Sequence, residues 1–325
     1  MHIVVCLKPV PNAQDIRINP ETKTLDRSGA SNVINPPDLN ALEMALQLKD
    51  KHGAKVTVLS MCPPFGEPFL RECVAMGADD AILLSDRAFA GSDTYPTSYT
   101  LAAGIRAISA LKQGEYKGAL PPPPTQPDGK PTPPSAPWLV GKDKPVFGKV
   151  DLVITGEETT DSSTGQTGPG IAEWNSWPQV TYIKDVTLIG ADGKPVNGKV
   201  EAVPNFKVHC TQDLEGARST WEADLPAVLS VNLGINTPRA PQLARKIMAQ
   251  KTFEISYWTK DALKDIDPTK LGLKGSPTVV GKIITIDVGD KKTEWIEDAD
   301  PTAAAKKLAD ALEARGLLKH LKGGN

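Results

Sequence analysis

The sequence is poor in the residues that build disulfide frameworks and metal sites. Only four cysteines and four histidines occur in 325 residues, and none stands in CxxC or ligand spacing. Three of the cysteines lie within apolar runs, which favours buried free thiols in a reducing cytoplasm over the alternative of a metal site. We therefore expect no metal, and we assign no acid–base chemistry to the histidines.

An excess of charge of one sign is also lacking. The 37 basic and 39 acidic residues give a net charge of −2, and no run of Lys or Arg is longer than two, which argues against nucleic acid as a partner. No apolar run approaches the roughly 18 residues of a membrane span. The amino-terminal apolar run ends at Lys8 and Pro9, too early for a signal sequence. These absences predict a cytoplasmic protein.

What the sequence does contain is an alternation of short apolar runs with helical patterns. Helices are predicted at 39–48 after an Asp38 cap, at 69–76 before Gly77, and at 99–111. Such alternation predicts an α/β fold with an open, mostly parallel, doubly wound sheet of the adenine-nucleotide-binding, Rossmann-like type. The runs that suit strands buried on both faces are residues 3–7, 55–61, 80–85, 151–155 and 179–183.

The second half of the chain is organised differently. Ten prolines between residues 116 and 150 indicate an extended insertion at 116–149, either a surface loop or arm or, alternatively, a ligand for a proline-recognition module. Further runs predict antiparallel strands or a continuation of the sheet, and two helices follow them. We predict a nucleotide-binding domain at 1–237 and a partner-wrapping extension at 238–325. The further strands are expected at 199–203, 206–210 and 225–231, and the helices at 240–249 and 301–318.

Residues 156–170 (GEETTDSSTGQTGPG) follow an apolar run and open a helix. A hydroxyl-rich loop between a strand and a helix presents free N–H groups and the positive end of the helix dipole to one place, which suits a phosphate. Neither the P-loop nor the GxGxxG spacing is present, so neutral donors would hold most of a phosphate. An ordinary connecting loop is the alternative. In the predicted sheet, Asn35, Ser60 and Met61 would converge on this loop.

Several motifs together resemble the β subunit of electron transfer flavoproteins. The resemblance covers nearly the whole chain apart from the proline-rich insertion, and it depends on the order and spacing of the motifs rather than on any one of them. The motifs are LKPVP at 7–11, NPPDLNALE at 35–43, AMGAD at 75–79, the 156–170 loop with WPQ at 177–179, and NTPR at 236–239.

The resemblance implies a heterodimer with an α subunit that carries FAD. The β subunit of this family binds a second adenine nucleotide, which is AMP in the simpler branch. In the electron-bifurcating branch it is a second FAD, which takes a hydride from NADH and divides the electron pair. The implied partners are an acyl-CoA dehydrogenase type flavoprotein and either ferredoxin or a quinone reductase. Because the flavin carries the chemistry, we expect no catalytic side chain and no enzyme activity of the subunit alone.

Residues 85–102 (SDRAFAGSDTYPTSYTLA) resemble the bifurcating branch, in which this stretch lies near the flavin ring. By that resemblance, Thr94 and Thr97 would offer hydroxyls to the ring, and Arg87 a cation that stabilises a reduced flavin. Alternatively, Thr94 or Thr97 only caps a helix.

The loop departs from the family pattern, because Ser163 replaces a second aspartate and Glu157 and Glu158 add carboxylates. Their charge would oppose a diphosphate unless the pair points away. By the resemblance, Pro9, Asn35 and Met61 enclose the adenosine. The loop candidates for phosphate and ribose are Gly156, Asp161, Ser163, Thr164, Gln166 and Thr167.

Residues 238–243 match the loop with which the family docks a dehydrogenase, and Leu243 takes the place of its docking leucine. The alternative is that Leu243 belongs to the core. Two other functions stay open: a β subunit that binds AMP and makes no redox contribution, and an adenine-nucleotide-binding regulatory or hydrolase domain.

Overall fold

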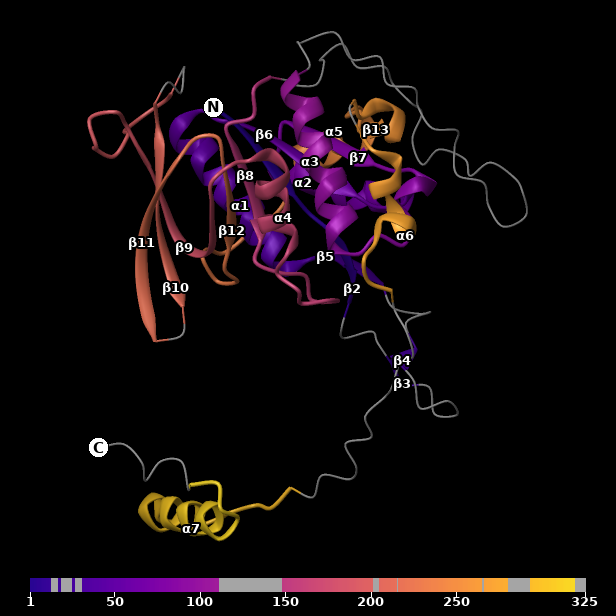
Figure 1. Ribbon diagram of the computed structural model, residues 1–325. Helices are drawn as coiled ribbons and strands as arrows, with labels where there is room; N and C mark the ends of the chain where they lie inside the picture. Colours follow the sequence, from indigo (N-terminus) through magenta and orange to yellow (C-terminus); the bar gives the residue numbers. More distant parts are fainter. Residues whose placement is uncertain are drawn as a thin grey trace. The chain divides into compact units, whose positions relative to one another are not determined.

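The computed structural model describes residues 1–12, 17–18, 25–26, 31–110, 148–200, 205–214, 216–264, 266–279 and 293–318 (Figure 1). The chain divides into two compact units, Met1–Gly281 and Lys282–Asn325. Most of the predicted proline-rich insertion, and most of the predicted strand at 199–203, lie outside the described residues.

The first unit is built on a nine-stranded sheet, which confirms the predicted fold class. Seven of its strands pair in parallel, in the spatial order β9-β12-β8-β1-β6-β7-β13. At one edge, β10 pairs antiparallel with both β9 and β11. In spatial order the strands are β11 (Ala217–Asp224), β10 (Lys207–Leu214), β9 (Gln179–Ile189), β12 (Ala227–Val231), β8 (Leu152–Gly156), β1 (His2–Cys6), β6 (Lys55–Met61), β7 (Asp80–Leu84) and β13 (Ser256–Trp258).

Helices cover both faces of the sheet, as the continuous burial of the central strands requires. Alternate residues of β1 enter different hydrophobic clusters: Ile3 and Val5 pack with the helices of one face, and Val4 and Cys6 with those of the other. The first face carries α1 (Pro36–His52), α2 (Glu67–Met76) and α5 (Leu243–Lys251); the second carries α3 (Thr94–Ala110) and α4 (Thr167–Asn175).

The predicted start of the first helix is wrong. Asp38 does not cap it, because α1 begins at Pro36, and Asn35 occupies the N-cap position without a side-chain cap bond. Two prolines form the first turn, where their missing N–H groups cost nothing. The Asp38 carboxylate instead accepts hydrogen bonds from other parts of the chain.

The end of α2 at Gly77 and the free cysteines are as predicted, whereas other helix boundaries differ by up to five residues. The helices predicted at 99–111, 240–249 and 301–318 are Thr94–Ala110, Leu243–Lys251 and Pro301–Ala314. Gly77 ends α2, and its N–H bonds to the Cys73 and Val74 carbonyl groups. All four cysteines are free; Cys62 is half-buried and the others are buried. Burial raises the pKa of the Cys210 thiol to about 12, as expected for an inert thiol.

Short elements complete the architecture, and β11 and β13 were not predicted. Three-residue β13 has no readable alternation, yet it extends the sheet beside β7 and buries Trp258. The remaining elements are β2 (Pro9–Pro11) paired with β5 (Asn32–Ile34), β3 (Arg17–Ile18) paired with β4 (Leu25–Asp26), the 3₁₀ turns Pro64–Gly66, Arg87–Phe89, Lys260–Ala262 and Pro268–Lys270, and α6 (Gly272–Gly275).

Residues 238–279 belong to the first unit. The second unit contains α7 (Pro301–Ala314), where the Asp300 side chain caps the helix by accepting from the Thr302 N–H. Among the described helices, none is long and apolar enough to cross a membrane.

Gly156, at the end of β8, allows the start of α1 to approach the sheet closely. A Cβ atom added there would lie 2.5 Å from Asp38 Oδ1 and 2.7 Å from Pro37 Cβ. Both neighbours belong to the buried first turn of a helix, so neither can move away easily. The glycine is therefore explained by packing, whatever the loop binds.

We predict that Gly156→Ala lowers the free energy of unfolding by about 1–3 kcal/mol through overpacking. Chemical denaturation measures this loss. Gly148→Ala is the control, because nothing lies within 4 Å of an added Cβ there, and it should be nearly neutral. Equal stability of the two variants would contradict the packing explanation.

Candidate functional site

The structure brings Asn35 onto the loop that follows β8. Asn35 is fully buried. Its Nδ2 donates to the Glu158 carbonyl oxygen at 2.8 Å, and its Oδ1 accepts from the Thr160 N–H at 3.1 Å. One side chain thus satisfies a donor and an acceptor of the loop backbone, which holds the loop at the carboxyl edge of the sheet.

Asp38 connects the two central strands at the same edge. Its Oδ2 accepts from the Lys8 N–H at 2.8 Å, and its Oδ1 accepts from the Gly156 N–H at 3.2 Å. Burial raises the pKa of Asp38 to about 7, although hydrogen bonds from Asn35, Lys8 and Gly156 oppose the shift. Asp38 is thus a buried acid at the base of the loop.

Lys8 and Asp161 form an ion pair across the loop. The Lys8 side chain is 45% exposed and that of Asp161 25% exposed. Partial burial disfavours the Asp161 carboxylate, but hydrogen bonds from Lys8 and Thr159, together with the Lys8 charge, outweigh it and lower the pKa of Asp161. The carboxylate that the sequence placed in the loop is therefore already paired with a cation.

Glu157 points away from the loop interior. Its carboxylate accepts from Asn232 Nδ2 at 2.7 Å and from the Leu233 N–H at 2.9 Å, both just beyond β12. These bonds direct its charge to the neighbouring connection. Of the two glutamates expected to repel a diphosphate, Glu157 is therefore directed away from the loop.

The loop then turns sharply into α4. Ser163 and Gly165 adopt left-handed backbone conformations, with φ of 48° and 63°. The Ser163 N–H donates to the Thr159 carbonyl oxygen at 2.7 Å. No side chain of the described residues caps α4. Pro169 has no N–H, and the Gly170 N–H bonds to the Gln166 carbonyl oxygen at 2.9 Å, so the N–H groups available to an anion are those of Thr167 and Gly168.

The start of α3 reaches the same loop. Thr94 Oγ1 donates to Gln166 Oε1 at 2.8 Å. The capping alternative for Thr94 and Thr97 is wrong, because the Asp93 carboxylate accepts from the Tyr95 N–H at 2.9 Å. The Thr94 hydroxyl is therefore committed to Gln166, and that of Thr97 is not used as a cap.

The other predicted site residues are spread around this edge. Arg87 is exposed in a 3₁₀ turn, and within the described chain its side chain forms no hydrogen bond or ion pair. Met61 is half-buried at the end of β6, and Pro9 is buried in β2. Thr164 is exposed in the loop. Among the described residues, hydrogen bonds or ion pairs link Asn35, Gly156, Asp161, Ser163 and the Thr94–Gln166 pair to the rest of the site.

Tyr182 is a neighbour of the loop that sequence reasoning missed. A bulge in β9 places two residues opposite Ser230, and the Tyr182 N–H donates to Ser230 Oγ at 3.3 Å. Tyr182 has a φ of 54°, and a Cβ added to Gly165 would lie 3.2 Å from its hydroxyl. Bulges that redirect a side chain are common beside functional sites, but alternation in the sequence does not reveal them.

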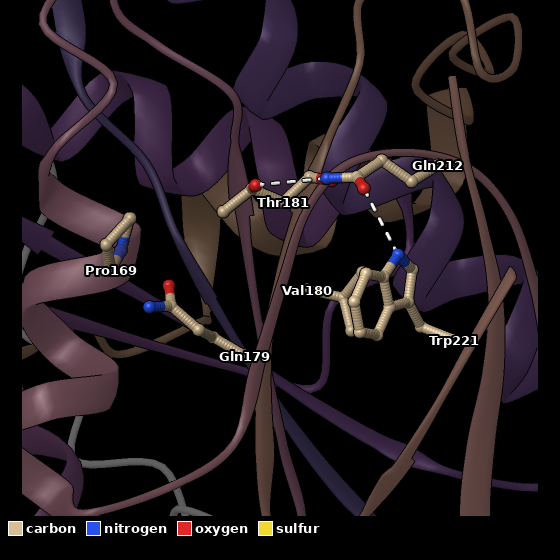
Figure 2. Close-up of a pocket in the computed structure, with 6 residues that line it drawn as sticks. All are labelled: Pro169, Gln179, Val180, Thr181, Gln212 and Trp221. Carbon is tan, nitrogen blue, oxygen red and sulfur yellow. Dashed lines mark hydrogen bonds between the residues drawn. The ribbon is translucent and has the colours of Figure 1, made fainter. Parts of the chain in front are cut away.

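A depression of about 360 Å³ is lined by Pro169 of the first turn of α4 and by residues of β9, β10 and β11 (Figure 2). Gln212 bridges its wall: Nε2 donates to the Thr181 carbonyl oxygen at 2.9 Å, and Oε1 accepts from Trp221 Nε1 at 3.2 Å. None of the predicted site residues lines it, and it contains no charged side chain. We assign the phosphate chemistry to the loop instead. In the described part of the chain, no cluster of three or more potential metal ligands occurs.

Comparisons with known proteins agree on one family. The family described as "Electron transfer flavoprotein domain" matches residues 22–111 and 141–263. "Protein FixA" of Azotobacter vinelandii is 37% identical over 322 residues, covering 98% of this chain and 96% of its own. "Electron transfer flavoprotein subunit beta" of Clostridium acetobutylicum is 38% identical over 89% of each chain. "Caffeyl-CoA reductase-Etf complex subunit CarD" of Acetobacterium woodii is 35% identical over 86% of each.

The raised pKa of Asp38 predicts a pH dependence of stability. The unfolded pKa is about 4 and the folded pKa about 7, so between these values the folded state binds the extra proton. The stabilisation associated with that proton is complete below about pH 4 and is lost as the pH rises through about 7.

Denaturation of the wild type and of Asp38→Asn between pH 4 and 8 tests this. The stability of the wild type relative to the variant should fall across the window, because Asn does not titrate. Asp38→Asn should also cost about 1–3 kcal/mol, since one oxygen now serves two N–H donors. A difference that is constant with pH would contradict the assignment.

Proposed function

Because the chain belongs to the electron transfer flavoprotein family and has an electron-transfer function of the β-subunit or FixA type, we propose that it binds an adenine nucleotide in the loop at 156–170 and works in the cytoplasm as the β subunit of a heterodimer. It is a subunit within an oxidoreductase complex rather than an enzyme alone. Family membership sets aside the regulatory or hydrolase domain.

The observation that carries this proposal is the loop at 156–170, which Asn35 holds at the carboxyl edge of the sheet through Glu158 and Thr160 and which leads into the uncapped amino end of α4. The loop presents backbone N–H groups, hydroxyls of Ser163, Thr164 and Thr167, and one cation, Lys8. This donor set fits a nucleotide phosphate. Pro9 and Met61 would enclose the adenosine end, Asp161 would reach the ribose, and Gln166 the ribose or phosphate.

We propose FAD as the nucleotide, with AMP as the alternative. The Thr94–Gln166 hydrogen bond joins the start of α3 to the phosphate loop, so the 85–102 segment that resembles the bifurcating branch adjoins the place where the rest of a dinucleotide would extend. Thr97 and Arg87 would then face the ring. Bound FAD would supply hydride acceptance from NADH and single-electron transfer. The outward bonds of Glu157 support the choice of a diphosphate.

The proposed partners are an α subunit with its own FAD, an acyl-CoA dehydrogenase type flavoprotein, and ferredoxin or a quinone reductase. CarD, one of the relatives, is named for a caffeyl-CoA reductase complex. That name supports a partnership with an enzyme of CoA esters. Flavin-based bifurcation is the mode of transfer we propose.

Leu243 fits a docking role because it is exposed. It begins α5 and is 75% exposed, and Ile247, one turn later, is 46% exposed. The preceding segment is anchored: the Arg239 guanidinium bonds to both Glu43 oxygens at 2.8 and 3.0 Å. The alternative that Leu243 belongs to the core is therefore wrong, and the segment that precedes the leucine is anchored to α1.

The nucleotide content of the heterodimer tests the function. We expect two FAD and no AMP per complex of this chain with its α subunit, measured by acid release and chromatography. One FAD with one AMP would instead support the non-bifurcating alternative. A complex without any nucleotide in the β subunit would contradict the proposal as a whole.

We expect Leu243→Ala to slow electron transfer to the dehydrogenase about tenfold or more, as loss of a central apolar anchor does, while both nucleotides remain bound. Stopped-flow flavin absorbance measures the rate. Leu214→Ala is the matched control, because this leucine is also exposed, at 43%, and lies at the end of β10. Equal rates in the two variants would remove Leu243 from the docking surface.

A further inference from the structure

Hydrogen bonds fix the backbone of Lys8, and they thereby limit the region that its ammonium group can reach. Its N–H donates to Asp38 Oδ2 at 2.8 Å, and its carbonyl oxygen accepts from the Asn35 N–H at 3.0 Å. Both partners are buried. From this anchored position the side chain extends over the loop and its Nζ donates to Asp161.

The ion pair supplies the loop with a cation from a distant part of the chain. Among the described residues, no other Lys or Arg forms an ion pair or hydrogen bond with residues 157–167. The loop itself contains three carboxylates, those of Glu157, Glu158 and Asp161, of which Glu157 is turned outward. A phosphate bound by this loop would therefore find in Lys8 the positive side chain that, among the described residues, already contacts the loop.

The pair is also suited to exchange. Exposed Lys–Asp pairs contribute little to stability, and the Lys8 ammonium group can form a charge-assisted hydrogen bond to a phosphate oxygen as it does to the Asp161 carboxylate. The phosphate would also accept hydrogen bonds from the Thr167 and Gly168 N–H groups at the start of α4. If a phosphate replaces Asp161 as the partner of Lys8, the bonds that the phosphate forms therefore outweigh the loss of the weak Lys8–Asp161 ion pair.

We propose that Lys8 is the phosphate-binding cation of this site and that it exchanges the Asp161 carboxylate for the nucleotide phosphate. The inference rests on the proposed nucleotide-binding function and deepens it, because sequence reasoning assigned the phosphate to neutral donors. The competing role is a latch, in which the Lys8–Asp161 pair only closes the loop. The two roles predict different effects on nucleotide binding when the Lys8 ammonium group and the Asp161 carboxylate are each removed by substitution.

The test uses the intact heterodimer after removal of the β-subunit nucleotide, with AMP and adenosine as probes in calorimetric titrations. Lys8→Met should weaken AMP binding about 10- to 100-fold, as loss of one charge-assisted bond does, and adenosine binding less than threefold. Lys8→Arg should retain the preference for AMP. Asp161→Asn should leave that preference intact or increase it, since it removes the competitor of the phosphate.

Lys184→Met is the matched control, because Lys184 pairs with Asp213 at 2.6 Å with side chains 46% and 31% exposed, almost as in the Lys8–Asp161 pair. It should bind both probes like the wild type. Equal losses for AMP and adenosine in Lys8→Met and Asp161→Asn would overturn the phosphate role and identify a latch. A wild-type complex that binds neither probe would overturn the proposed function itself.

Discussion

The buried carboxylate of Asp38 joins the ends of β8 and β1 to the first turn of α1, and the candidate site is built around this connection. Its two oxygens accept from the N–H groups of Lys8 and Gly156, which follow or end neighbouring central strands. Gly156 has no side chain, so the helix can come close enough for these bonds to form. The contact stabilises the carboxyl edge of the sheet, where ligands of open α/β folds bind.

The same helix also holds the segment that we propose for docking. Asn40 Nδ2 donates to the Asn236 carbonyl oxygen at 2.8 Å, and Asn236 Nδ2 returns a bond to the Asn40 carbonyl oxygen at 3.0 Å. One turn later, Glu43 accepts the Arg239 fork. Helix α1 therefore contacts the loop at 156–170 through its N-cap residue, Asn35. Further along, it binds Asn236 and Arg239, which precede Leu243. Both proposed functions depend on a single rigid element.

Charge placement around the loop follows from tertiary bonds rather than from composition. The loop sequence is acidic and suggests repulsion of a phosphate. In the folded chain, Glu157 is bonded beyond β12 and Asp161 is paired with Lys8. The loop has an acidic sequence, yet in the folded chain it offers hydroxyls, helix N–H groups and one ammonium group to the nucleotide that we propose.

The sequence by itself determined the layer order, because apolar runs of five to seven residues alternating with helical periods allow few other folds. It also determined the family, through motifs in a fixed order, and the position of the loop at 156–170. Only the tertiary structure decided what Asp38, Glu157 and Lys8 do. Each bonds to groups far away in the chain, and local pattern contains no information on such pairs. The same reason explains why Asp38 was mistaken for a cap, and why the bulge that turns Tyr182 toward Gly165 was not foreseen.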